Sequence, residues 1–127
     1  MKQPVSSGAG ARPKGPYSQA IVAGGPVVYV SGQGPIDPET GDKRLGSFRE
    51  QAELTLRNVG ALLEAAGTSF DHVVKVNAYL ADLADFGEFN TIYREFFHEP
   101  YPARTTVQAG LSEIAIEIDC IATLPDR

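Results

Sequence analysis

The stretch SFREQAELTLRNVGALLEAAG, at residues 47–67, decides the fold that this sequence predicts. Ser47 followed by Glu50 is the residue pair that forms a capping box at a helix start. Behind it, apolar side chains recur at helical spacing: Phe48, Ala52, Leu56, Val59, Leu62, Leu63 and Ala66. Gly67 is the residue type that ends helices in the left-handed conformation. We therefore expect an amphipathic helix whose apolar face covers another layer.

A second helix and several strands are expected around this first helix. Residues 73–80 (VVKVNAYL) are β-branched and aromatic, which is typical of a strand. Asp82 can cap a helix whose apolar stripe holds Leu83, Phe86, Phe89, Ile92, Tyr93, Phe96 and Phe97. Upstream, residues 17–23 and 27–31 flank the turn Gly24-Gly25-Pro26. That turn chemistry predicts a β-hairpin.

The last segment, YPARTTVQAGLSEIAIEID at residues 101–119, holds the candidate chemistry. Arg104 lies on a Thr/Val-rich run, and residues 114–118 alternate with period two, so both runs are expected to be strands. Glu117 belongs to the face opposite the isoleucines, whereas Cys120 shares the isoleucine face and is expected to be a buried thiol. Arg104 and Glu117 could bind a carboxylate and transfer a proton. A surface ion pair is the commoner role of two such residues.

The order of these elements predicts a single α+β domain over residues 1–127, with residues 1–14 as a loosely ordered N-terminal arm. Two amphipathic helices need one apolar sheet face to cover, which gives two layers. The strands at residues 27–31 and 73–80 carry apolar side chains on both faces. We therefore expect oligomerisation through the uncovered face.

The composition excludes several classes of protein. A net charge of -5 over 127 residues argues against general affinity for nucleic acid. We expect no membrane span, because no apolar run approaches the ~20 residues that one needs. We expect no secretory signal, and a single cysteine suits the reducing cytoplasm.

Two distant histidines without a cysteine cluster predict no metal site. Gly32 and Gly34 lack the third glycine of a dinucleotide loop, and Ser18 and Ser31 lack the adjacent base of a hydrolase triad.

Several motifs appear together in a recognisable order: GPYSQA at 15–20, SGQ at 31–33, LRNVGALLEAAG at 56–67, VVKVNAYL at 73–80, FNTIYREFF at 89–97, PARTTV at 102–107 and IEIDCIA at 116–122. With them the chain resembles the RidA/YjgF family of enamine/imine deaminases, from about residue 15 to residue 122. The resemblance implies a chorismate-mutase-like two-layer fold, with a mixed six-stranded sheet and two helices on one face. It also implies a homotrimer whose pockets lie between subunits.

The resemblance also assigns roles to the two charged residues. Arg104 matches the arginine that grips the substrate carboxylate, and Glu117 matches the glutamate that orients a water. Thr106 stands where many relatives carry cysteine, and contributes there through its backbone. The implied chemistry needs no metal or organic cofactor.

Four further positions match the family's pocket. Tyr17 and Asn90 match residues that line it, while Ser31 and Gly32 match the strand end that closes it. The expected ligands are small 2-imino acids and their 2-keto acid products.

The chain departs from the family pattern between Arg104 and Glu117. Leu111-Ser112 replaces the usual Leu-Pro, and the interval is shorter. Because a slip of one residue reverses every side chain of a strand, this loop controls which face Glu117 occupies. A two-residue turn at Gly110-Leu111 would pair the two final strands directly and set Arg104 opposite Glu117. The family topology instead puts another strand between them.

The function implied is hydrolytic deamination of 2-iminobutanoate and 2-iminopropanoate to 2-keto acids and ammonia. Three alternatives stay open at this stage. The first is a related deaminase of aminoacrylate or aminomuconate, and the second is a non-catalytic regulatory trimer that binds 2-keto acids. The third is the ribonuclease activity reported for some relatives, against which the acidic charge argues.

Overall fold

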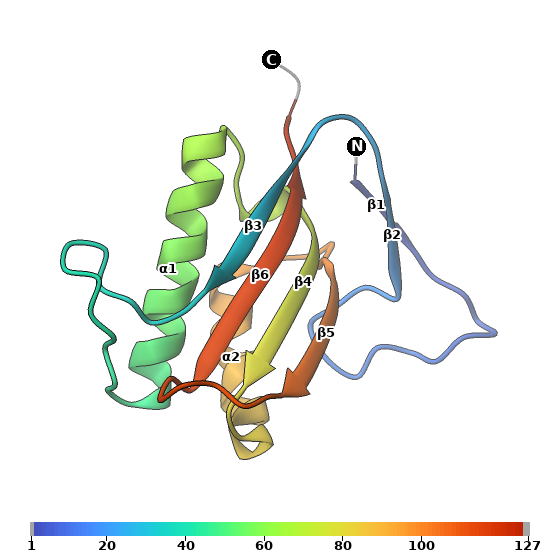
Figure 1. Cartoon of the computed structure of the whole chain (residues 1–127). Coiled ribbons are helices and arrows are strands. Elements are labelled where there is room, and N and C mark those ends of the chain that lie inside the picture. The colour runs from blue at the N-terminus through green and yellow to red at the C-terminus, as the bar shows by residue number, and fades with distance from the viewer. Residues whose placement is uncertain (1, 126–127) are drawn as a thin grey trace.

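The computed structural model describes residues 2–125, which form two sheets and two α-helices. The main sheet has the order β3-β6-β4-β5, with bounds Val27–Gln33, Ile116–Thr123, Val73–Leu80 and Ala103–Gln108. Strands β1 (Lys2–Val5) and β2 (Ala20–Ala23) form a separate antiparallel pair. Helices α1 (Phe48–Ala66) and α2 (Phe86–Phe96) lie on one side of the main sheet, whose other face is open (Figure 1). The expected α+β architecture, with both helices on one face of a mixed sheet, is confirmed.

Both predicted helices are present. At the start of α1, Ser47 Oγ accepts from the Glu50 backbone N–H at 3.1 Å, and Glu50 Oε1 accepts from the Ser47 N–H at 3.1 Å. Gly67 ends α1 in the left-handed conformation, with φ of 89°. Asp82 caps a short 3-10 helix, η2 (Leu83–Asp85), and α2 follows it directly. A second 3-10 helix, η1 (Phe70–His72), precedes β4.

The core lies between the helices and one face of the sheet. Its fully buried side chains include Leu56, Val59, Leu63, Val76, Leu80, Phe89, Ile92, Tyr93, Ile116 and Ile118. Cys120 is buried among them, as its parity predicted, and burial raises the pKa of its thiol to about 12. The alternation along β6 therefore directs Ile116 and Ile118 to the helices and Glu117 to the open face.

The predicted hairpin between residues 17–23 and 27–31 is wrong. Strand β2 pairs with β1, and β3 pairs with β6 through Val28↔Ala122 and Val30↔Cys120. The cause lies in the turn: Pro26 has no N–H for a ladder, and its carbonyl accepts from Leu124 N at 3.0 Å, which extends the β3–β6 pairing. The six expected strands therefore divide into sheets of four and two rather than one sheet of six.

The N-terminal arm is partly built into the fold. Residues Lys2–Val5 form β1, residues 6–14 are exposed, and Met1 lies outside the described residues. The side chain of Gln19 holds this loop, because its Oε1 accepts from Ser7 N at 2.7 Å and its Nε2 donates to Ala11 O at 2.6 Å.

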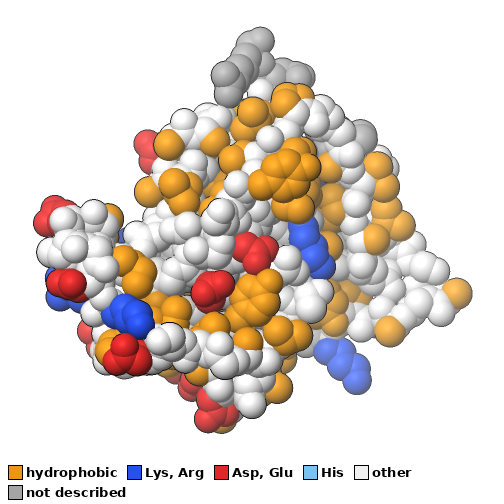
Figure 2. All heavy atoms as spheres, viewed as in Figure 1, with side chains coloured by type: hydrophobic (Ala, Val, Ile, Leu, Met, Phe, Trp, Pro, Cys, Tyr) orange, Lys and Arg blue, Asp and Glu red, His pale blue; other side chains and the backbone are white. Residues whose placement is uncertain are grey.

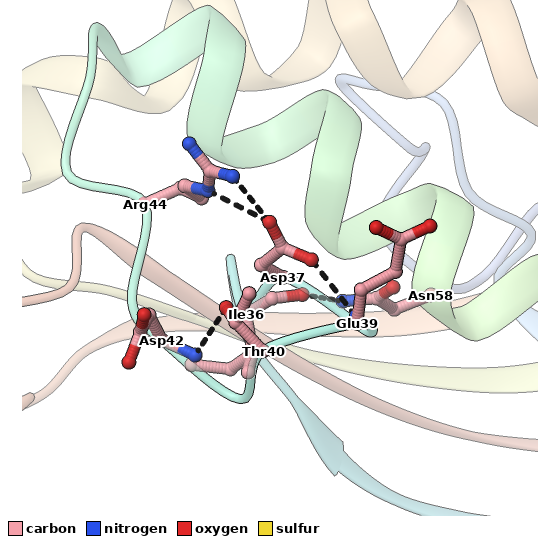
Figure 3. Close-up of polar contacts among 7 residues, drawn as sticks. All are labelled: Ile36, Asp37, Glu39, Thr40, Asp42, Arg44 and Asn58. Atoms are coloured by element: carbon pink, nitrogen blue, oxygen red, sulfur yellow. Dashed lines mark hydrogen bonds and ion pairs between the residues drawn. The ribbon is translucent and has the colours of Figure 1, made fainter.

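The connection from β3 to α1 is held by side chains (Figure 3). Asn58 Nδ2 donates to the carbonyls of Gly34 (3.1 Å) and Ile36 (2.9 Å), which fastens the start of the loop to α1. Asp37 accepts from the Glu39 N–H and pairs with Arg44 (Figure 3). Across the described part of the chain, no helix has the length and apolarity to span a membrane.

Candidate active site

Arg104 lies near the start of β5 on the side of the sheet that the helices cover. In the parallel β4–β5 pairing it aligns with buried Val76, and aligned residues in a sheet share a face. Four aromatic rings surround its guanidinium carbon, with centroids at 4.8 Å (Tyr93), 5.2 Å (Phe89), 5.7 Å (Tyr17) and 5.7 Å (Phe86). These ring faces stabilise the cation and exclude water from it.

The guanidinium of Arg104 lacks an anion. No carboxylate among residues 2–125 forms an ion pair with it, and its buried Nη1 has no hydrogen-bond acceptor there. Burial lowers its pKa, and the nearby Arg94 lowers it further, whereas Tyr93 and Tyr17 raise it. A buried cation without a partner is costly, and a bound anion would relieve that cost.

Other polar atoms at this end of the sheet are also unsatisfied. Asn90 Oδ1, Tyr93 OH and Thr106 Oγ1 are buried and have no hydrogen-bond partner among the described residues. Thr106 lies two residues beyond Arg104 on β5 and aligns with buried Ala78, so it shares the face of Arg104. Together these atoms could hold a small polar ligand.

The segment with the sequence GPYSQA covers Arg104. A Cβ placed on Gly15 would lie 3.5 Å from the Tyr17 ring, 3.6 Å from Arg104 Nη2 and 3.7 Å from Asn90 Nδ2, so these three side chains converge there. Ser18 anchors the segment, because its backbone N–H donates to Pro102 O at 3.1 Å and its hydroxyl donates to Tyr101 O. Tyr17, Asn90, Thr106 and Arg104 form what we term the arginine half-site.

Glu117 occupies the open face of the sheet. It aligns with half-buried Tyr79 of β4, and its carboxylate rests on Gly32 of β3: a Cβ on Gly32 would lie 2.5 Å from Glu117 Oε2. The β3–β6 register shifts between Val30 and Gln33, which places Ser31 and Gly32 in this irregularity. Ser31, Gly32 and Glu117 form what we term the glutamate half-site. Gly32 is required there because any larger residue would displace the carboxylate.

A polar cluster lies beside the glutamate half-site on the same open face. Tyr79 OH and Asn77 Nδ2 each donate to one carboxylate oxygen of Asp119, both at 2.9 Å. The hydrogen bond to Asp119 raises the pKa of Tyr79, and the charge of Glu117 adds to that effect. A hollow of about 370 Å³ at Ser31, Gly32 and Asp119 opens beside this cluster. Figure 2 shows acidic and basic side chains gathered near the middle of this face.

The two half-sites do not meet within one chain. Strand β4 lies between β5 and β6, so the Gly110-Leu111 hairpin that would pair them is wrong, and the intervening strand that the family topology implies is present. Arg104 faces the helices, whereas Glu117 faces away from them. The shortened loop leaves Glu117 in the register that the isoleucine alternation predicted.

The profile of the Endoribonuclease L-PSP family matches residues 9–124. The chain belongs to the RidA/YjgF family. A RutC family protein of Pyrococcus horikoshii is 43% identical over 124 residues, which cover 96% of this chain and 98% of that protein. The human 2-iminobutanoate/2-iminopropanoate deaminase is 42% identical over 110 residues, covering 85% of this chain and 80% of that enzyme.

A solved member of the RidA/YjgF family has the same fold. The structure of Escherichia coli TdcF with bound serine superposes with a TM-score of 0.72 at 34% identity, covering 97% of this chain and 99% of TdcF. Serine is thus bound to one of these relatives, and another is named for its action on two small imino acids.

Three aromatic residues that surround the arginine half-site were not predicted from the sequence to lie there. Phe86, Phe89 and Tyr93 were assigned to the core stripe of α2, yet they also enclose Arg104. Their spacing carries no signal for this second role, because the same spacing serves any buried helix face. The exposure of Phe86, at 39%, distinguishes it only once the structure is known.

A larger hollow lies away from both half-sites. It encloses about 580 Å³ between α1 and the residues around Phe70, and Arg57 and Glu64 stand at its edge. Over residues 2–125 there is no cluster of three or more side chains suited to a metal ion.

Proposed function

We propose that this protein hydrolyses 2-imino acids, such as 2-iminobutanoate and 2-iminopropanoate, to 2-keto acids and ammonia. The observation that carries the proposal is the buried guanidinium of Arg104, which lacks an anion among the described residues. The two oxygens of a substrate carboxylate can accept hydrogen bonds from two N–H groups of this guanidinium in a bidentate pair. The human relative named 2-iminobutanoate/2-iminopropanoate deaminase supports the same substrate class.

The proposal includes a homotrimer in which each active site joins the arginine half-site of one subunit to the glutamate half-site of its neighbour. It rests on the opposite placement of Arg104 and Glu117 across the sheet. The open face also exposes large apolar side chains, since Tyr29 is 73% exposed and Val107 is 42% exposed. A head-to-tail contact of this kind closes into a ring when the rotation between subunits permits.

In the proposed reaction Arg104 holds the carboxylate and thereby fixes the electrophilic carbon of the imine. Glu117 takes a proton from a water molecule, and the water oxygen forms a bond to that carbon while the C=N π electrons move to nitrogen. Glu117 then returns the proton to the nitrogen. The hydroxyl proton of this tetrahedral intermediate then passes to the NH2 group by way of Glu117 as the C=O bond forms. The C–N bond breaks, and ammonia leaves with the 2-keto acid.

The other residues of the half-sites orient these groups. In the arginine half-site Asn90 Oδ1 can accept a hydrogen bond and the Thr106 hydroxyl can accept or donate one, and Tyr17 covers the half-site. Ser31 is exposed beside Glu117 and can contact the water or the tetrahedral centre. A cytoplasmic location stays a prediction from the sequence.

A coupled assay tests the proposal. An amino-acid oxidase or a dehydratase generates each imine in the presence of semicarbazide, which traps any imine that escapes hydrolysis. We expect the protein to suppress semicarbazone formation with short aliphatic imines and the Glu117→Gln variant to leave it unchanged. Semicarbazone formation at the uncatalysed level with the wild-type protein, together with measurable 2-keto acid binding, would favour the non-catalytic binding protein instead.

A further inference from the structure

The loop that leads into β6, residues 109–115, is held in a costly conformation. Glu113 has φ of 71°, in the left-handed region that residues with a Cβ rarely occupy. This loop also contains Leu111-Ser112, where the chain departs from the RidA/YjgF pattern. Because a loop under strain favours any slip that relaxes it, the ladders of β6 with β3 and β4 need support where the strand begins.

Gln51 provides such a contact from the first turn of α1. Its side chain is buried, with 6% exposed, and its two polar atoms bind two different segments. Oε1 accepts from the Ala115 backbone N–H at 2.8 Å, and Nε2 donates to the Gly46 carbonyl at 3.0 Å. The Ala115 carbonyl accepts from Ala81 N at 3.0 Å. Both polar groups of Ala115 are thus fixed two residues before Glu117.

Three further contacts fasten the rest of the loop. Lys43 Nζ donates to the Ser112 carbonyl at 3.0 Å and pairs with Glu113 Oε1 at 3.2 Å. A Cβ on Gly34 would lie 3.0 Å from Ile114 Cδ1, so Ile114 packs directly on the end of the β3 segment. Lys43 and Glu113 are solvent-accessible, whereas Gln51 is buried and its two hydrogen bonds are partly buried.

We propose that Gln51 is a positioning residue for Glu117: its amide holds Ala115 and so fixes the register that keeps the Glu117 carboxylate against Gly32. The role of Glu117 in this statement rests on the proposed function, but the control of register does not. An amide suits this place because it supplies one acceptor and one donor to two backbone groups, which no apolar side chain does. Gln51 touches neither substrate nor reacting atoms.

The test compares Gln51→Met, Gln51→Glu and Thr55→Val. Methionine keeps the length of glutamine but offers Ala115 no strong acceptor, whereas glutamate keeps an acceptor for Ala115 and loses the donor to Gly46. Thr55 is the matched control: it is buried one turn further along α1, and its hydroxyl has no partner among the described residues. Amide hydrogen exchange at residues 115–118 measures how firmly the start of β6 is held in its ladder and needs no enzymatic turnover.

We expect Gln51→Met to speed exchange at residues 115–118 by roughly tenfold, Gln51→Glu to speed it less, and Thr55→Val to leave it unchanged. In the imine assay Gln51→Met should lower kcat severalfold while the Kd for 2-oxobutanoate stays within about twofold, because Arg104 lies on the other face. Should Gln51→Met fail to fold, Lys43→Met should give a smaller shift in the same direction.

Unchanged exchange in Gln51→Met, or equal changes in Gln51→Met and Gln51→Glu, would overturn the proposal. The proposed function can fail separately. Faster exchange in a protein whose wild-type form shows no turnover would leave the register role standing and remove the deaminase. Normal turnover in the wild-type protein, with unchanged exchange in Gln51→Met, would leave the deaminase standing and remove the register role of Gln51.

Discussion

The arginine and glutamate half-sites differ in nearly every physical respect. Arg104 lies on the helix-covered face, enclosed by aromatic rings, with no ion-pair partner among residues 2–125 and with its pKa lowered by burial. Glu117 lies on the open face against the backbone of Gly32, beside a polar cluster whose carboxylate is fully hydrogen-bonded. One half resembles a preformed anion pocket, and the other a half-buried carboxylate on a rigid strand.

The sheet separates the candidate carboxylate-binding group, Arg104, from the candidate proton-transfer group, Glu117. A sheet that separates the two groups keeps them from neutralising each other as an internal ion pair, which is the usual fate of a neighbouring Arg and Glu. The cost is the free energy of keeping a cation buried without an anion. The aromatic rings around Arg104 offset part of that cost, and an anion from a ligand or a neighbouring subunit would offset more of it.

The largest expected effect follows from removing the cation. Arg104→Ala loses the bidentate grip and the orientation of the substrate, so kcat/KM should fall by about 10⁴-fold. Arg104→Lys should also lose most activity, because lysine keeps the charge without the planar fork. Kinetics and calorimetry with 2-oxobutanoate measure both variants. Near-normal activity in Arg104→Lys would show that the site needs only a point charge.

Glu117→Gln should lower turnover without weakening ligand binding, and so distinguish the function of the glutamate half-site from that of the arginine half-site. The amide keeps the shape but accepts no proton at neutral pH, so kcat should fall by roughly 10²–10⁴-fold. Binding of 2-oxobutanoate should persist, because Arg104 is untouched. The semicarbazide assay and calorimetry measure the two quantities side by side. Turnover at the wild-type rate would make Glu117 a bystander.

Two glycines offer a matched pair of substitutions, one in each half of the site. Gly32→Ala would place a Cβ 2.5 Å from Glu117 Oε2, whereas Gly15→Ala would meet its nearest neighbour at 3.5 Å, an ordinary contact. We expect Gly32→Ala to lower kcat by about 10²-fold through displacement of the carboxylate, and Gly15→Ala to change it little. Equal effects of the two substitutions on kcat would contradict the close packing of Glu117 on Gly32.

The smallest expected effect concerns the helix-covered face of the sheet. Cys120 lies on the same face as Arg104, aligned with Val76, and burial raises its thiol pKa to about 12. Because a raised pKa leaves almost no thiolate at pH 8, iodoacetamide should not label the native protein and should label it fully in denaturant. Mass spectrometry measures the adduct. Rapid labelling of the native protein would show that this face opens to solvent.

The sequence predicts the elements of this fold better than their pairing. The capping box at Ser47, the stop at Gly67 and the isoleucine alternation around Glu117 are local signals, and each is confirmed. The hairpin prediction failed because strand pairing depends on distant partners: the turn residue Pro26 binds Leu124, which is far away in the sequence. Turn chemistry alone carries no information about that choice.

For the candidate site too, the sequence predicts which residues take part better than it predicts how they are arranged. Motif matching places Arg104, Tyr17, Asn90 and Thr106 together, and the structure brings the first three around Gly15. Their aromatic enclosure and the anchoring of the β6 loop by Gln51 depend on contacts between elements, which periodicity does not encode. The separation of Arg104 from Glu117 likewise needs the strand order, not the spacing between the two residues.

The central claim is that each active site takes its arginine and its glutamate from different subunits. It is tested by mixing Arg104→Ala with Glu117→Gln in equal amounts, unfolding the mixture and refolding it together. Each site of a mixed ring then has a one-in-two chance of an intact Arg104 and, independently, of an intact Glu117 from the neighbour. We predict about a quarter of wild-type turnover from two nearly inactive parents. Turnover no higher than the average of the two parents would contradict the account.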